Sequence, residues 1–221
     1  MSTTERKKRE REKRKQVILN ATQRLITERG FESVTMDEIA VASEVSKGTL
    51  YLYFKSKSEI ALALHGIGMQ AMLKKLAELI AASGSGLEII QKMGRLLVDF
   101  VRDNPPFFKC IVYLESIGIE SYKQLKGTDT FEALQTLDES LFNYIRRAVQ
   151  IGIQDGSIDA TYKPELLTLQ IMATARGLMQ FIIFRDAGLF LVAGLEAANI
   201  TLEHLMDDYS ALLVRALNPK H

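Results

Sequence analysis

Apolar residues recur at helical spacing along almost the whole chain, and the alternating pattern of a β-strand is absent. Breaker runs such as Ser83-Gly84-Ser85-Gly86 and Asn104-Pro105-Pro106 separate these stretches. We therefore predict an all-α protein. In the first part of the chain, helices are expected over about residues 9–29, 35–43, 47–54 and 56–82. One further helix is expected around the apolar stripe at 89–101, and a shorter one follows the two prolines and ends at about residue 117. The last helices are expected around 134–149 and over about 164–187 and 202–216.

Positive charge is concentrated at the N-terminus. Residues 1–15 contain eight Lys/Arg and three Glu, a net charge of +5, whereas the whole chain carries only +1. Such an asymmetry is expected where one end of a protein meets an anionic polymer. Two interpretations of the residues before Glu10 remain open: a solvated tail, or an arm that contacts DNA phosphates or the minor groove.

The chain lacks the residue patterns that several classes of protein require. Cys110 is the only cysteine, which fits a reducing cytoplasm. The N-terminus has no signal-peptide pattern, and the longest apolar run, residues 187–195, is far shorter than the ~20 residues of a membrane span. The three histidines are scattered, and no phosphate loop or nucleophile elbow is present. We expect a soluble, cytoplasmic protein that is not an enzyme, with no cofactor, no metal and no membrane partner.

Residues 35–54 have the pattern of a helix-turn-helix. Thr35 and Glu38 have the spacing of a capping box, and Ser46 can cap a second helix after a turn at Glu44-Val45. A small shared core is predicted from Ile39, Ala40, Val45, Leu50 and Phe54.

The second of these helices has an outward face suited to DNA. Lys47 and Thr49 can reach base edges, and Gly48 allows close approach of the backbone. Hydroxyls and charges nearby can hold phosphates, although the two tyrosines could instead be packing residues. The predicted DNA-binding residues are Thr35, Ser46, Lys47, Gly48, Thr49, Tyr51, Tyr53 and Lys55.

Three runs carry a family resemblance: Gly30-Phe31, residues 35–40 (TMDEIA) and residues 45–57 (VSKGTLYLYFKSK). Together they resemble the N-terminal signature of the tetracycline-repressor (TetR) family. The resemblance implies a helix-turn-helix DNA-binding domain over 1–60 and a helical ligand-binding and dimerisation domain over 61–221. It also implies that the last two long helices of two subunits pack as a four-helix bundle.

The predicted helix that ends near residue 187 is apolar on nearly every side, so packing against a single face of its own domain cannot cover all of its apolar surface. We predict a homodimer through this helix and the last one, which would bind a near-palindromic double-stranded operator. A central helix buried within one subunit is the alternative. The apolar residues are Leu169, Ile171, Met172, Ala173, Ala175, Leu178, Met179, Phe181, Ile182, Ile183 and Phe184.

A hydrophobic effector, such as a drug, a fatty acyl compound or an aromatic, suits the apolar bundle. Its candidate site is lined by Phe100, Phe107, Cys110, Tyr113, Phe142, Met172 and Met179, although any of them can be ordinary core. The sequence favours a ligand-responsive repressor. An activator or ligand-independent regulator of the same fold, a DNA-tethered enzyme and an interaction module that no longer binds DNA are the alternatives.

Overall fold

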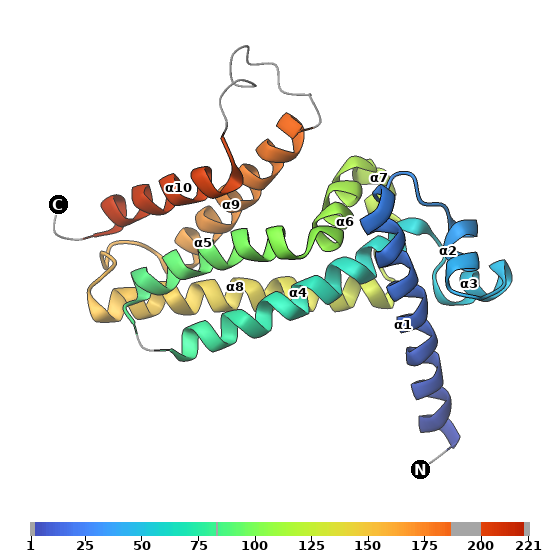
Figure 1. The fold of residues 1–221 in the computed structure, drawn as a ribbon. Coiled ribbons are helices and arrows are strands. Elements are labelled where there is room, and N and C mark those ends of the chain that lie inside the picture. The colour runs from blue at the N-terminus through green and yellow to red at the C-terminus, as the bar shows by residue number, and fades with distance from the viewer. Residues whose placement is uncertain (1–2, 83, 187–199, 219–221) are drawn as a thin grey trace. The chain divides into compact units, whose positions relative to one another are not determined.

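The computed structural model describes residues 3–82, 84–186 and 200–218, and these ranges contain helices and no strand (Figure 1). The predicted all-α class is confirmed. The helices are α1 (Thr3–Arg29), α2 (Met36–Ala42), α3 (Lys47–Tyr53), α4 (Lys57–Ala81), α5 (Gly86–Asp103), α6 (Pro105–Ser116), α7 (Gly118–Lys123), α8 (Asp129–Asp155), α9 (Pro164–Asp186) and α10 (Leu202–Leu217).

The first of two compact units combines Met1–Met69 with Asn104–Gln135. In it α1 packs against α2 and α6, and α2 packs against α3. Fully buried side chains from these helices and from the start of α4 form the core. Burying each such large apolar side chain contributes about 1.5–3 kcal/mol, which holds the short helices α2 and α3 in place. The largest of these side chains are Ile18, Ile26, Ile39, Leu50, Phe54 and Ile60.

The second unit combines Gln70–Asp103 with Thr136–His221. Here α10 packs against α5 and α9. The start of α5 lies directly on α8, because a Cβ on Gly86 would collide with the backbone of Gly152. The backbone N–H of Gly86 donates to Asp155 Oδ2 at 2.8 Å, which satisfies one free donor of the α5 N-terminus.

Two helical features differ from the sequence prediction. The start predicted near Arg9 is wrong, because α1 already begins at Thr3. The prediction relied on apolar periodicity, whereas these first turns are polar and have Glu–Arg pairs four residues apart, which favour a helix. Helix α7 was not predicted, because none of its residues is buried and it therefore shows no apolar stripe.

The division predicted at residue 60 concerns function and stays a prediction, since the two compact units interleave along the chain. The predicted helix end near Ala187, the apolar run at 187–195 and the side chains of Ile183 and Phe184 lie outside the described residues. Among the helices of the described ranges, none combines the length and the apolarity that crossing a membrane requires.

Candidate DNA-binding site

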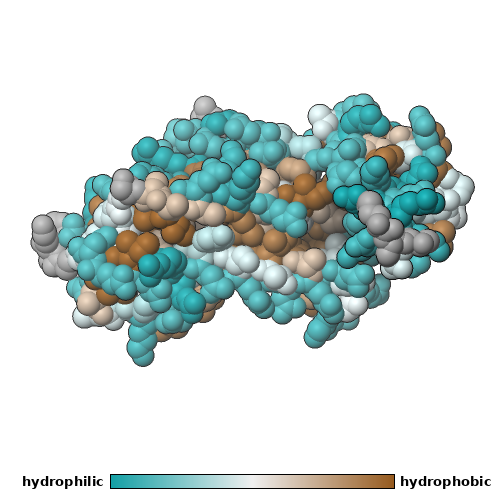
Figure 2. Space-filling view, turned by 90° about the horizontal axis from the view of Figure 1, so that it is seen from below, coloured by the Kyte–Doolittle hydropathy of each residue, from teal (hydrophilic) through white to brown (hydrophobic). Residues whose placement is uncertain are grey.

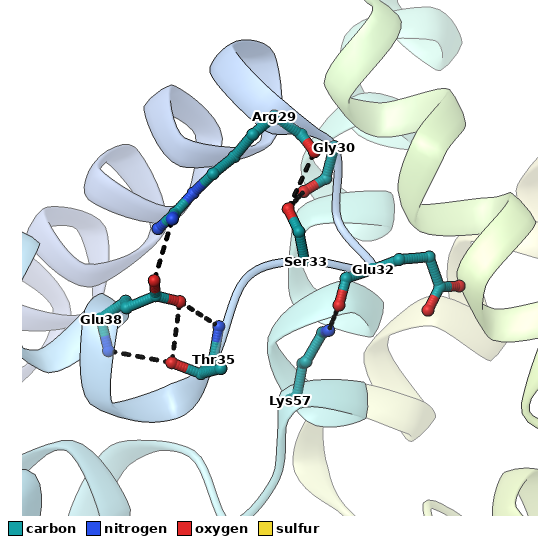
Figure 3. A network of polar contacts seen from close by, with 7 residues as sticks. All are labelled: Arg29, Gly30, Glu32, Ser33, Thr35, Glu38 and Lys57. Atoms are coloured by element: carbon teal, nitrogen blue, oxygen red, sulfur yellow. Dashed lines mark hydrogen bonds and ion pairs between the residues drawn. The ribbon is translucent and has the colours of Figure 1, made fainter.

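The orientation of α2 is fixed by a polar network that links it to the end of α1 (Figure 3). Thr35 and Glu38 form the predicted capping box: Glu38 Oε2 accepts from the backbone N–H of Thr35 at 2.8 Å, and the N–H of Glu38 donates to Thr35 Oγ1 at 3.3 Å. Arg29 Nη1 lies 2.9 Å from the other carboxylate oxygen of Glu38. Hydrogen bonds from Thr35 and the charge of Arg29 lower the pKa of the Glu38 carboxyl, so it stays ionised in this network.

The chain between α1 and α2 is held by a second group of contacts. Gly30 has φ +79°, the left-handed conformation that lets a glycine end a helix. Lys57 Nζ donates to the carbonyl of Glu32 at 2.9 Å and lies 4.9 Å from the ring centroid of Phe31 and 5.0 Å from that of Tyr113. Burial lowers the pKa of Lys57. This ammonium group therefore joins α4, α6 and the α1–α2 connection.

The turn between α2 and α3 is also built from local signals. Glu44 adopts φ 54°, which is uncommon for a residue with a side chain. The N–H of Val45 then bonds to the carbonyl of Ala40 at 3.0 Å, and Ser46 Oγ accepts from the N–H of Thr49 at 3.1 Å. Ser46 is therefore the N-cap of α3, as predicted. Val45 is only half-buried, so its predicted place in the shared core is weaker than those of the fully buried Ile39, Leu50 and Phe54.

The N-terminal end of α3 presents its polar side chains at the surface. Lys47 Nζ lies 2.7 Å from Asp37 Oδ1, and this partner raises the pKa of the lysine. Exposed ion pairs of this kind are weak and can be exchanged for a phosphate or a base edge. The Thr49 hydroxyl lies 2.8 Å from Ser46 Oγ. The ammonium group of Lys47 therefore lies at the surface beside Asp37, in a pair that a stronger partner can displace.

Gly48 is exposed on the first turn of α3. A Cβ built on it would meet only Ser46 Oγ, at 3.9 Å, so the protein itself does not require a glycine here. A residue without a side chain at this position would allow a partner to approach the helix closely.

The remaining predicted DNA-binding residues are less uniform. Tyr51 is exposed and Tyr53 is half-buried. Lys55 Nζ donates to the Tyr51 carbonyl at 2.9 Å. The hydroxyl of Thr35 already donates to Glu38 Oε2 at 2.8 Å, so this residue serves the capping box first. For all eight residues, contact with DNA stays a prediction.

Two exposed apolar side chains on these helices were not predicted as functional. Val41 on α2 is 79% exposed and Leu52 on α3 is 69% exposed. Their positions follow from the helical period, because the residues beside them, Ala40 and Leu50, take the buried face. Exposed methyl groups of this kind can contact a thymine methyl.

The seven predicted ligand-binding residues divide between the two compact units. Phe107, Cys110 and Tyr113 lie on α6 in the first unit, and the other four lie on α5, α8 and α9 in the second. Burial raises the pKa of the Cys110 thiol to about 12, so this cysteine is an unreactive, buried side chain. The ring of Tyr113 packs edge-on against Phe31, with centroids 4.5 Å apart. That the seven share a pocket stays a prediction.

The predicted dimerisation helices carry exposed leucines. On α9, Leu166 is 56% and Leu169 is 53% exposed, while Ile171 and Ile182 are buried within the unit. On α10, Leu212 is 61% exposed. The two helices therefore bury one apolar face and leave another at the surface of the described residues.

The helix-turn-helix region is similar to that of known regulatory proteins. Residues 18–64 match the family model described as bacterial regulatory proteins, tetR family. A fatty acid metabolism regulator protein of Bacillus subtilis is 26% identical over 192 residues, which cover 86% of this chain and 92% of that protein.

Solved structures share the fold. FadR from Bacillus subtilis, a transcriptional regulator in complex with stearoyl-CoA, aligns with a TM-score of 0.67 and 19% identity over 92% of this chain and 99% of that one. AibR, in complex with isovaleryl coenzyme A and operator DNA, aligns with a TM-score of 0.59 and 20% identity over 90% of this chain and 97% of that one.

The chain thus combines a capped helix-turn-helix with a match to a family of bacterial regulatory proteins, which is the combination of a DNA-binding regulator. Residues 18–64 therefore form a DNA-binding domain of the TetR family of transcriptional regulators.

Proposed function

We propose that this protein is a ligand-responsive repressor that binds a near-palindromic operator as a homodimer and leaves it when a hydrophobic effector of the fatty acyl-CoA class binds. The observation that carries the proposal is the exposed first turn of α3, where Lys47 and Gly48 lie at the surface of a firmly capped helix-turn-helix. In this proposal residues 1–60 bind DNA, and residues 61–221 form the dimer and bind the effector. The protein does not act as an enzyme in it.

In the proposed complex, α3 enters the major groove. Lys47 exchanges Asp37 for an acceptor on DNA, Thr49 reaches a base edge, and Gly48 lets the helix approach closely. Tyr51, Tyr53 and Lys55 contact phosphates and so set the register of the protein without specifying sequence. Thr35 and Ser46 act mainly through their caps, which hold α2 and α3 at a fixed angle.

The exposed leucines of α9 and α10 support the dimer. A monomer would leave the side chains of Leu166, Leu169 and Leu212 in water, whereas a two-fold interface covers the same patch on both subunits. Such a dimer places two copies of α3 one helical turn of DNA apart, about 34–36 Å, or a multiple of it.

The effector class is supported by the relatives. The sequence relative from Bacillus subtilis is a fatty acid metabolism regulator, and the aligned FadR structure holds stearoyl-CoA. AibR holds isovaleryl coenzyme A. An effector that binds better when the two α3 helices are misplaced lowers DNA affinity by its differential binding energy, typically about 1–3 kcal/mol.

The experiment has two stages. The full-length protein first selects duplexes from a random library at moderate salt, and its affinity for the selected duplex is measured by fluorescence anisotropy. A series of acyl-CoA thioesters from short to long chains is then titrated into the complex, with free coenzyme A as the control. We expect at least a fivefold loss of DNA affinity with part of the series and none with coenzyme A. A library from which no duplex is selected contradicts DNA binding, and a complex indifferent to the whole series contradicts the effector class.

A further inference from the structure

The N-terminal half of α1 is a helix that packs on nothing described. Every residue from Thr4 to Arg14 is exposed, and Figure 1 shows this part of the helix extending past α2 and α3. Figure 2 views the molecule from below, the side toward which this part of the helix points. A helix that is polar all round gains no core burial, so it forms here through its own charge pairs.

Those pairs follow the favourable order. Glu5 precedes Arg9 by four residues, and Glu10 precedes Arg14 by four. A glutamate on the N-terminal side of a cation at this spacing stabilises a helix by about 0.2–0.5 kcal/mol per pair. Two of the three glutamates in residues 1–15 therefore support the helix, and the segment still keeps a net charge of +5.

The cations of this segment are not evenly distributed around the helix. With about 100° per residue, five of them fall within about 120° of arc and no glutamate lies among them. We refer to this group as the cationic stripe: Lys7, Lys8, Arg11, Arg14 and Lys15. The other three cations, Arg6, Arg9 and Lys13, lie outside this arc, as do Glu5, Glu10 and Glu12.

The direction of the stripe is set by the buried half of the same helix. The row Lys7, Arg11 and Lys15 continues at spacings of three and four into Ile18 and Thr22, which are completely buried. The core-facing side of α1, which packs against α2 further along, therefore becomes the cationic side where the helix leaves the core. The cations therefore project on the same side of α1 as the residues that pack against α2 and α6.

Charge complementarity identifies the occupant. From residue 7 to residue 15 the stripe is about 12 Å long at about 1.5 Å per residue. One strand of B-DNA carries a phosphate about every 3.4 Å along the axis, so the stripe matches three to four phosphates. A row of cations that no glutamate interrupts suits the duplex backbone next to the site proposed for α3.

We propose that the cationic stripe is a second DNA-binding surface that contacts the phosphates flanking the α3 half-site. This inference rests on the proposed operator binding. It adds affinity without sequence information, because phosphate contacts are the same for every sequence. The extension thus acts as a rigid helical continuation of α1.

The chain offers a charge-matched control for this surface. The stripe variant Lys7→Gln, Arg11→Gln, Arg14→Gln removes one lysine and two arginines, and so does the opposite-face variant Arg6→Gln, Arg9→Gln, Lys13→Gln. Glutamine keeps a helix propensity close to that of lysine and arginine. Affinity of the full-length proteins for a library-selected duplex with long flanks is measured against salt concentration, and helix content is checked by circular dichroism.

We expect the stripe variant to lower the slope of log K against log salt by about 2–3 per subunit, at about 0.9 per lost phosphate contact, and the opposite-face variant by less than 1. Trimming the flanks from the duplex should reproduce the loss in the wild type. Equal losses in both variants would overturn the stripe in favour of net charge alone, and wild-type slopes in both would overturn any contact. A wild type that selects no duplex contradicts the proposed function instead.

Discussion

The helix-turn-helix and the C-terminal helices α9 and α10 use their exposed residues in opposite ways. In α2 and α3 the exposed polar side chains also cap helices and bridge turns, so a contact such as Ser46 to Thr49 fixes local geometry. In α9 and α10 the exposed residues include leucines that make the surface apolar. The surface proposed to contact DNA is thus stabilised by its own contacts, whereas the exposed leucines of α9 and α10 would be covered only in the proposed dimer.

The largest effect should come from the core beneath α3. Leu50→Ala removes a completely buried side chain from a small unit and should lower the free energy of unfolding by about 2–5 kcal/mol. Leu52→Ala, two residues away and 69% exposed, should change it by less than about 0.5 kcal/mol. Urea denaturation followed by circular dichroism measures both. Similar losses in the two variants would show that α3 is packed in a different register.

Charge on the exposed face of α9 should break the dimer. Leu169→Asp places a carboxylate in the proposed apolar interface and should weaken self-association at least 100-fold, about 2.7 kcal/mol, while the subunit stays folded. Analytical ultracentrifugation measures the association. Ile119→Asp, at a more exposed apolar position on α7, is the control and should associate as the wild type does. A dimer unchanged by Leu169→Asp would place the interface elsewhere.

A smaller effect separates DNA binding from folding at Gly48. Gly48→Ala meets only Ser46 Oγ at 3.9 Å and should raise helix stability by about 0.5–1 kcal/mol. We expect it nevertheless to weaken operator binding about tenfold, because the new methyl group lies between α3 and the groove. Gly94→Ala on α5, whose Cβ would meet Met206 at an ordinary 3.5 Å, should bind DNA normally. Wild-type affinity in Gly48→Ala would remove Gly48 from the interface.

The smallest effect concerns the cap of α2. Thr35→Ala removes the capping box and should cost about 1 kcal/mol of stability, whereas Thr35→Ser should retain most of it. Because the pKa of Glu38 is lowered in the folded state, its contribution is present at neutral pH and is lost as the pH falls through that pKa. The difference between the wild type and Thr35→Ala should therefore shrink on acidification. A difference that is independent of pH would mean that Glu38 does not take part in the cap.

Sequence patterns predicted the helix-turn-helix well because its determinants are local. The caps at Thr35 and Ser46 act over three residues, and the turn at Glu44 depends on its neighbours. The start of α1 was missed because apolar periodicity says nothing about a helix that packs on no core. The effector site could not be predicted in the same way, since a pocket is assembled by long-range packing, which local sequence patterns do not record.

The direction in which the cations of α1 point could not be predicted from the sequence either. The excess of lysine and arginine is visible in composition, but its direction follows only once the helix is known to be continuous from Thr3 to Arg29. A flexible arm would have had no cationic side. The continuity of the helix converts a count of charges into a surface with a defined orientation.

The sequence preference of two α3 variants tests most directly whether this helix binds the operator. Affinities of the wild type, Lys47→Ala and Tyr53→Phe are measured for the selected duplex and for all its single-base variants. We predict that Tyr53→Phe weakens binding to every duplex by the same factor, while Lys47→Ala also loses discrimination at one or two base pairs, worth about 1–3 kcal/mol each. An unaltered preference in Lys47→Ala would contradict base contact by this residue, and unaltered affinity in both variants would contradict DNA binding through α3.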